Sequence, residues 1–320
     1  MAASPSTFSI IVPVFNALTY LERTAPALRD LVDATPGAEL IFVDNGSTDG
    51  SWEKIKSFES ENTKTVFQPD VNVGEVRNAG ARVAAGSVLV FVDSDCLVDS
   101  EYLESIEAAL VLSGAPAVGA YYSMSPDPNW LERAWHRLHE PRADGFTSWV
   151  PAGNLAVRAD VFRSVGGFRP DLTSGEDVDL CRRIEAAGMP VYQSLGIVSR
   201  HLGNAQKAGD FIRKHAWHGE GMIAAEGRRR LSRPLIMTVA HWLLVVGVAT
   251  VVLVLRQPFL RSTLLILAAF CTIPILTLVF RSIQKRRFIE PISGAAAYAL
   301  YYYARGVSLL RLLSRPGSTR

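Results

Sequence analysis

Two aspartates separated by a single residue carry the clearest chemical signal in the chain. Asp93 and Asp95 follow Val88–Val92, an apolar run whose β-branched and aromatic residues indicate a strand buried on both faces. Carboxylates are costly to bury, so an acidic pair at the end of such a strand implies solvent or a cation. A divalent metal held by these carboxylates together with substrate phosphates fits the pattern. The alternative is a solvated turn, in which Asp and Ser are common.

A second acidic stretch, Gly175–Leu180, contains three carboxylates near the expected start of a helix. Acidic residues stabilise the first turn of a helix without any catalytic role, and this alone would explain Glu176 and Asp179. The functional interpretation is a general base, which must lie within hydrogen-bonding reach of an attacking hydroxyl and have a suitable pKa. Asp177 is a candidate for that role.

The elements that must position these residues alternate regularly in the first 110 residues. Strand patterns at Phe8–Val12, Glu39–Val43, Thr65–Gln68 and Val88–Val92 are each followed by a helical pattern. This alternation predicts an α/β fold with a parallel, doubly wound sheet and with the polar clusters gathered at one edge. At that edge, the glycine-rich helix entry at Gly74–Gly80 could bring backbone N–H groups and a basic side chain towards a phosphate.

Four motifs in this order resemble family 2 glycosyltransferases, which have the GT-A fold. They are Val12–Asn16, Val43–Asp49, Arg77–Gly80 and Asp93–Asp95, and the resemblance extends over about residues 8–205. It implies a nucleotide-diphospho-sugar donor, bound by residues of these motifs: Pro13, Val14, Phe15, Asn16, Asp44, Asn45, Arg77, Asn78, Asp93 and Ser94. Asn45 stands where many members have a second Asp, so the choice of nucleotide stays open.

The same resemblance implies a metal ion and a catalytic base. Asp95 would bind Mg²⁺ or Mn²⁺ on the donor diphosphate, and His201 would be a further ligand, although a lone His is usually structural. Asp177 matches the base position of the family's Glu-Asp motif, with Asp179 as the alternative. Residues on the acceptor side or supporting it would be Glu176, Asp179, Trp149, Gly153 and Asn154.

Two apolar segments near the end of the sequence indicate a membrane region. Leu235–Leu255 has 21 residues and Ser262–Phe280 has 19, and neither contains Asp, Glu, Lys or Arg. Each can cross a ~30 Å hydrocarbon layer, whereas buried core helices are a poor explanation for two such runs in tandem. Basic residues flank the pair outside the connecting loop, which predicts a cytoplasmic catalytic domain: Arg228, Arg229, Arg230, Arg233, Arg281, Lys285, Arg286 and Arg287.

The predicted domains are therefore a GT-A domain at 1–231 and a membrane region at 232–320. Within the second, a helix is expected at about 292–313. Arg305, Ser308, Arg311 and Arg315 fall on one arc of its pattern, opposite an apolar face. We expect it to lie on the cytoplasmic membrane surface; a third membrane span is the alternative.

Composition limits the remaining possibilities. Lys and Arg (33) nearly balance Asp and Glu (31), which gives no reason to expect a nucleic-acid partner. The three cysteines, Cys96, Cys181 and Cys271, form no disulfide framework or zinc pattern, which favours a reducing compartment. No Gly-x-Gly-x-x-Gly follows the first strand, so a Rossmann dehydrogenase is excluded.

The sequence predicts a multi-pass protein of the inner (cytoplasmic) membrane that acts as a metal-dependent, inverting glycosyltransferase in cell-envelope polysaccharide synthesis. Its acceptor would be a hydroxyl of a lipid-linked glycan or glycolipid, and a homo-oligomer stays open. One alternative is a polyprenyl-phosphate sugar transferase, whose ionised acceptor needs no base. Another is a non-catalytic scaffold that binds sugar nucleotides. Arg213 and Trp217 depart from the spacing of the Gln-x-x-Arg-Trp motif of processive members, which weighs against a polymer-extruding synthase.

Overall fold

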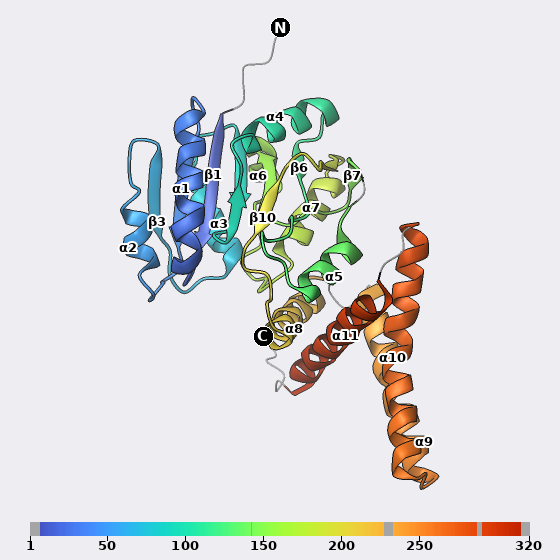
Figure 1. Cartoon of the computed structure of the whole chain (residues 1–320). Helices are drawn as coiled ribbons and strands as arrows, with labels where there is room; N and C mark the ends of the chain where they lie inside the picture. The colour runs from blue at the N-terminus through green and yellow to red at the C-terminus, as the bar shows by residue number, and fades with distance from the viewer. Residues whose placement is uncertain (1–6, 142, 227–232, 287–289, 315–320) are drawn as a thin grey trace. The chain divides into compact units, whose positions relative to one another are not determined.

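The computed structural model of the chain describes residues 7–141, 143–226, 233–286 and 290–314. The chain divides into two compact units (Figure 1). The first unit comprises residues 1–127 and 141–204, and the second comprises residues 128–140 and 205–320.

The first half of unit 1 is the predicted parallel sheet. Four parallel strands lie in the order β3-β2-β1-β4. Their bounds are Phe8–Val14 (β1), Glu39–Asp44 (β2), Thr63–Phe67 (β3) and Val88–Val92 (β4). The helices that connect or follow them are Leu18–Ala34 (α1), Ser51–Lys56 (α2), Val73–Val83 (α3) and Tyr102–Ser113 (α4).

The second half of the sheet is mixed rather than parallel. Strand β8 pairs antiparallel with β4, and the order continues β8-β6-β9-β7 to complete eight strands. The bounds are Ala117–Gly119 (β6), Gly145–Thr147 (β7), Asn154–Arg158 (β8) and Val191–Gln193 (β9), with helices at Ala159–Ser164 (α6) and Glu176–Ala186 (α7). Three of these strands have only three residues, too few to show a periodic pattern in the sequence.

A separate two-stranded sheet brings His201 next to the acidic pair. Strand β9 ends at Gln193, although the strand-like sequence continues to Val198, and a second short strand, Ser199–His201 (β10), follows. It pairs antiparallel with Cys96–Val98 (β5), so that His201 lies opposite Cys96. The carbonyl of Asp95 accepts a hydrogen bond from the Leu202 N–H at 2.8 Å, directly after this strand.

Helices cover both faces of the main sheet. Successive side chains of each strand point to opposite faces, so the apolar strands need a packed layer on both sides. Along β1, Ile10 and Val12 point into a core shared with Leu21 and Leu28 of α1 and with α4. Ile11 points to the opposite core, which contains residues of α3, α6 and α7. Two cores on one sheet define a doubly wound α/β architecture, and its parallel strands end together at the edge that holds the acidic pair.

Unit 2 is entirely helical in the residues described. Its helices are Trp130–His139 (α5), Ala208–Glu226 (α8), Arg233–Val254 (α9), Phe259–Gln284 (α10) and Pro291–Ser314 (α11). Leu131, Phe211, Leu278 and Tyr298 share a core that joins α5, α8, α10 and α11. Helices α5 and α8 thus pack with the C-terminal helices, although both begin before the predicted domain boundary at residue 231.

Helices α9 and α10 are long and apolar enough to cross a membrane. Only 22% and 17% of their most apolar windows are buried, so most of their apolar surface is exposed. Helix α9 begins two residues before the predicted range 235–255 and ends one residue before its end. Helix α10 extends beyond both ends of the predicted range 262–280. The flanking Arg228–Arg230 and Arg287 lie outside the described residues.

Helix α11 differs in detail from the predicted surface helix. Ser308 is buried, although the sequence pattern placed it on the polar arc, and Arg305 lies over the ring of Tyr301 at 5.1 Å. Part of the expected polar face therefore packs inside unit 2. With 24 residues α11 is long enough for a span, but among the described helices only α9 and α10 combine such a length with the apolar composition of a membrane span.

Candidate active site

Asp93, Asp95 and His201 form a cluster suited to a divalent cation. One ligand atom from each lies within 4.8 Å of the others, and His201 Nε2 lies 3.6 Å from Asp95 Oδ2. Gly203 makes this approach possible, since a Cβ there would lie only 2.0 Å from Asp95 Oδ2. Carboxylate oxygens with one imidazole suit Mg²⁺ or Mn²⁺ and leave coordination positions for a substrate.

Asp93 is held in one orientation by three neighbours. Its Oδ1 accepts a hydrogen bond from Arg77 Nη2 at 2.7 Å, and its Oδ2 accepts one from the Tyr122 hydroxyl at 3.0 Å. A Cβ at Gly153 would lie 2.1 Å from the same Oδ2, so only glycine fits there. Burial opposes ionisation of Asp93, but the charge and hydrogen bond of Arg77 outweigh it and hold the pKa below its usual value.

Arg77 lies buried between two carboxylates. Besides Asp93 it reaches Glu176, where Nη1 donates to Oε1 at 2.7 Å. Burial alone would lower the pKa of the guanidinium, but Asp93 and Glu176 raise it above its usual value. Arg77 therefore links the carboxyl end of β4 to the first residue of α7.

Asp177 lies in the first turn of α7, directly after Glu176. Its Oδ1 accepts the Val178 N–H at 2.7 Å and its Oδ2 accepts the Ala152 N–H at 3.3 Å. Burial, followed by the charge of Glu176, raises the pKa of Asp177 to about 6. A carboxylate of that pKa is ionised at neutral pH and is still basic enough to accept a proton in a reaction.

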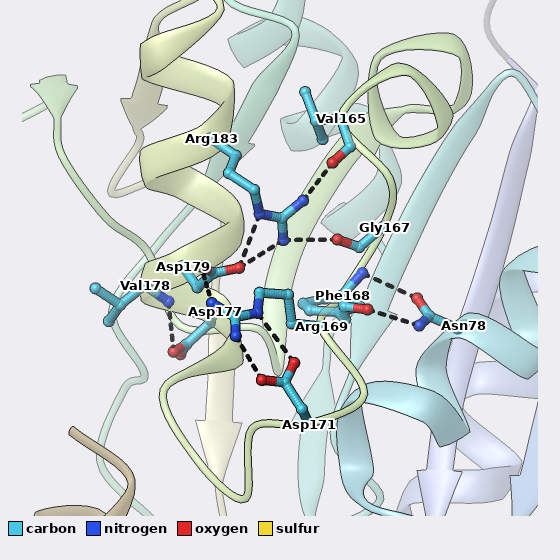
Figure 2. A network of polar contacts seen from close by, with 10 residues as sticks. All are labelled: Asn78, Val165, Gly167, Phe168, Arg169, Asp171, Asp177, Val178, Asp179 and Arg183. Carbon is cyan, nitrogen blue, oxygen red and sulfur yellow. Dashed lines mark hydrogen bonds and ion pairs between the residues drawn. The ribbon is translucent and has the colours of Figure 1, made fainter. Parts of the chain in front are cut away.

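Asp179 is engaged in ion pairing instead (Figure 2). Arg183 Nε and Nη2 lie 2.8 and 2.7 Å from Asp179 Oδ2, and Arg183 also donates to the carbonyls of Val165 and Gly167. Asp179 therefore orients an arginine that holds the chain between α6 and α7. This makes it a weaker candidate base than Asp177.

Asn78 is tied to the same segment (Figure 2). Its Nδ2 donates to the Phe168 carbonyl at 2.8 Å, and its Oδ1 accepts the Phe168 N–H at 2.9 Å. These reciprocal bonds fasten α3 to the chain that leads into α7. Within the described structure Asn78 is thus a structural link, and its predicted contact with the donor stays a prediction.

The residues predicted to bind the base of the nucleotide lie in the loops that follow β1 and β2. Asn16 has a left-handed backbone (φ 48°), and its Oδ1 accepts the Thr48 N–H at 2.9 Å, which joins the two loops. Asp44 Oδ1 accepts two N–H groups, those of Gly46 and Ser47, each at 2.9 Å. Its Oδ2 has no hydrogen-bond partner among the described residues.

The other residues of these loops differ in exposure and partners. Pro13 and Val14 complete β1, and the Phe15 side chain is 60% exposed beyond it. Asn45 forms reciprocal hydrogen bonds with the backbone of Val71, at 2.9 and 3.2 Å. Asn45, which stands where many family members have Asp, therefore fastens the loop after β2 to the backbone of Val71.

Three further predicted residues have distinct surroundings. Asn154 is fully buried, and its Oδ1 accepts the Tyr102 hydroxyl at 2.7 Å, so it supports the sheet from inside. The Ser94 carbonyl accepts Thr24 Oγ1 at 2.8 Å. The Trp149 indole N–H lies beside Asp177 and slightly lowers its pKa, but forms no hydrogen bond of normal geometry among the described residues.

Tyr122 belongs to the site but was missed by sequence reasoning. Its hydroxyl binds Asp93, and its ring packs edge-on against His201 with the centroids 4.8 Å apart. It thus contacts two members of the cation cluster. The only signal was its place just after a short strand, because no motif surrounds it.

Comparison with known proteins defines the class. Residues 9–125 match the family model described as "Glycosyl transferase family 2". Over 98% of this chain and 89% of the other, the fold matches a mannosyltransferase from Pyrobaculum calidifontis, determined with GDP-Man and Mn²⁺ (TM-score 0.64, 16% identity). The fold is thus of the GT-A type, and the matched residues include the Asp93–Asp95 stretch of the site.

Two relatives agree with this class. Validoxylamine A glucosyltransferase of Streptomyces hygroscopicus subsp. jinggangensis is 30% identical over 60% of this chain and 55% of its own length. Glycosyltransferase AglE of Haloferax volcanii is 28% identical over 74% of this chain and 80% of its own length. The chain thus spans about half the length of the first relative. Residues 9–125 therefore have the sequence pattern of family 2 glycosyltransferases, and both relatives are named as glycosyltransferases.

Proposed function

We propose that this enzyme transfers a sugar, with inversion, from a nucleotide-diphospho-sugar to an acceptor hydroxyl. The observation that carries the proposal is that one unit contains both the cluster suited to a cation (Asp93, Asp95 and His201) and the Asp177 carboxylate, with its pKa of about 6. A single in-line displacement needs one base and stabilisation of the leaving diphosphate. The mannosyltransferase of similar fold was determined with GDP-Man and Mn²⁺, which supports a sugar nucleotide and a metal for this chain also.

In this proposal, Asp95 and His201 hold Mg²⁺ or Mn²⁺, with Asp93 beside them. The bound ion would stabilise negative charge on the leaving diphosphate. Arg77 and Tyr122 keep Asp93 ionised and fixed in orientation, through hydrogen bonds of 2.7 and 3.0 Å. The cluster therefore needs little rearrangement when a cation and donor bind.

Asp177 is the proposed base. As the acceptor hydroxyl attacks the anomeric carbon, its proton passes to the Asp177 carboxylate while the bond from that carbon to the diphosphate oxygen breaks. The N–H groups of Val178 and Ala152 orient the carboxylate, and Glu176 keeps it basic. Trp149, Gly153, Glu176 and Asn154 would support the acceptor side.

The loops after β1 and β2 are proposed to bind the nucleotide. Asp44 Oδ2 is an acceptor without a partner among the described residues, which suits a ring N–H, and Phe15 offers an exposed aromatic face. Asn16, Asn45, Asn78 and Ser94 would complete or support this pocket. Arg77 is proposed to position Asp93 and Glu176, and direct contact with a donor phosphate is the alternative.

The acceptor is proposed to be membrane-associated, such as a lipid-linked glycan or glycolipid. Helices α9 and α10 support this, because their exposed apolar surfaces suit lipid. Arg233 and Arg281, near the two ends of the α9–α10 pair, favour a cytoplasmic catalytic unit in the inner membrane.

Transfer assays with Asp177→Asn test the proposal against its rivals. We expect sugar transfer to fall by about 10²–10⁴-fold, because the hydroxyl loses its base. Activity that survives the substitution would favour a polyprenyl-phosphate acceptor, which is already ionised. Donor binding without transfer to any acceptor by the unaltered protein would favour a scaffold.

A further inference from the structure

Positive charge is concentrated in unit 2 of the chain. This unit contains 19 Lys and Arg residues against 6 Asp and Glu residues, a formal charge of +13. Unit 1 contains 14 Lys and Arg residues against 25 Asp and Glu residues, a formal charge of −11. The near-neutral total therefore conceals a strongly basic unit, which is the unit that contains both candidate membrane helices.

Helix α5 presents part of this charge on an exposed face. Trp130, Arg133 and Arg137 recur at helical spacing, within an arc of about 60°, and all three are exposed. The opposite face, with Leu131 and Leu138, is buried in the core of unit 2. Neither arginine has an acidic side chain within ion-pair distance among the described residues, so both charges are available to another molecule.

Helix α8 repeats the combination. Arg213 and Trp217 are one turn apart and both exposed, although Arg213 also pairs with Asp210 on its own helix. The two helices are neighbours, since the rings of Trp135 and Phe211 pack edge-on at 5.1 Å. Tryptophan beside arginine is typical of surfaces at the lipid headgroup level, where an amphipathic ring and a cation both find partners.

We propose that the exposed faces of α5 and α8, carrying Trp130, Arg133, Arg137, Arg213 and Trp217, bind the anionic headgroups of a lipid bilayer. We call these five residues the headgroup surface. The proposal rests on the membrane association proposed above, and it adds a requirement for anionic lipid. A basic, tryptophan-bearing surface in the same unit as two exposed apolar helices is complementary to a negatively charged bilayer.

The experiment follows the fluorescence of Trp130 in the full chain reconstituted into vesicles that contain brominated lipids, which quench nearby tryptophan. The vesicles consist of phosphatidylcholine alone or of a mixture with phosphatidylglycerol. The difference between the unaltered protein and Trp130→Phe isolates the Trp130 signal. We expect this signal to be quenched more strongly in the phosphatidylglycerol mixture, and the gain to shrink at high salt.

The variant that removes the charge is Arg133→Gln/Arg137→Gln. Each arginine should change the equilibrium between docked and undocked helices by about fivefold, so the pair should abolish most of the gain from phosphatidylglycerol. Arg158→Gln/Arg163→Gln is the matched control, since it removes two exposed arginines from unit 1. This control should retain the gain.

Two results would overturn the proposal. If Trp130 remains unquenched in both lipids, the headgroup surface does not contact the bilayer, and a soluble partner, such as an acidic protein, becomes the better candidate. Equal quenching in both lipids, unaffected by Arg133→Gln/Arg137→Gln, would show that headgroup charge plays no part. Donor binding is measured on the same samples, so a failure of the headgroup surface is distinguished from a failure of the proposed transferase function.

Discussion

Asp177 differs from Asp93 because its surroundings favour the protonated form. Burial and the Glu176 charge raise its pKa to about 6, whereas Arg77 holds the pKa of Asp93 low. Two carboxylates with opposite shifts in one site suit two different tasks, since one stays ionised and the other exchanges a proton.

The pH profile tests this division. We expect kcat/KM for transfer to fall tenfold per pH unit below about 6, as Asp177 becomes protonated. Glu176→Gln removes the negative neighbour, so the acid limb should move to lower pH. An acid limb that stays in place in Glu176→Gln would contradict the assignment of Asp177.

Stability should respond to the same carboxylate. A folded-state pKa above the usual value penalises the ionised form, so the free energy of unfolding should decrease as pH rises from about 4 to about 6. Asp177→Asn removes this penalty and should stabilise the protein at neutral pH by on the order of 1 kcal/mol. Chemical denaturation at neutral and acidic pH measures it; an equal effect at both would count against the raised pKa.

Arg77→Lys separates positioning from phosphate binding. A lysine cannot donate to Asp93 and Glu176 at once in the manner of a guanidinium, so kcat should fall by about 10–100-fold while the donor KM changes little. Arg82→Lys, on the exposed face of the same helix, is the control. A large rise in donor KM with kcat unchanged would instead favour contact with a donor phosphate.

At the scale of elements, the chain from Val165 to Phe168 is held by α3 and α7. Asn78 binds the backbone of Phe168 twice, and Arg183 binds the carbonyls of Val165 and Gly167 (Figure 2). These polar ties set the entry to α7, whose first turn contains Glu176 and Asp177. The position of the base therefore depends on side chains that need not contact a substrate.

Asn78→Ala tests this dependence. It leaves the Phe168 N–H and carbonyl without their partner, which should cost about 1–3 kcal/mol of unfolding free energy. Donor affinity should change much less than stability, if Asn78 is a structural link. Asn62→Ala, an exposed asparagine of unit 1, is the control, and a large loss of donor affinity at normal stability would restore the predicted donor contact.

Longer strands were predicted from the sequence more accurately than short ones. Apolar runs such as Val88–Val92 correctly predicted the three inner parallel strands, because a strand buried on both faces is continuously apolar. The partly exposed strand β3 was predicted at 65–68 and lies at Thr63–Phe67. The three-residue strands β6, β7 and β9 show no such pattern, and β10, at Ser199–His201, was not predicted because the strand-like stretch ends at Val198. The motif residues came together, but the partners of Asp179 and Asn78, and the role of Tyr122, arise from long-range packing that local sequence does not encode.

At the scale of the whole molecule, the chain combines a mixed α/β unit with a helical unit that exposes two apolar helices. We expect the full chain to remain in the membrane pellet after alkaline carbonate extraction, because surfaces of this kind are stable in lipid and not in water. Leu267→Arg, near the middle of α10, should reduce the pelleted fraction. Release of the unaltered chain by carbonate would contradict membrane spanning.

Donor binding tests the central claim most directly. Detergent-solubilised full-length protein is titrated with nucleotide-sugars in the presence of Mn²⁺ or EDTA, and binding is followed by thermal stabilisation. We predict a metal-dependent shift with one donor, lost in Asp95→Ala and retained in Asp177→Asn. Absence of a shift with every nucleotide-sugar, with and without Mn²⁺, would contradict the account of the donor site.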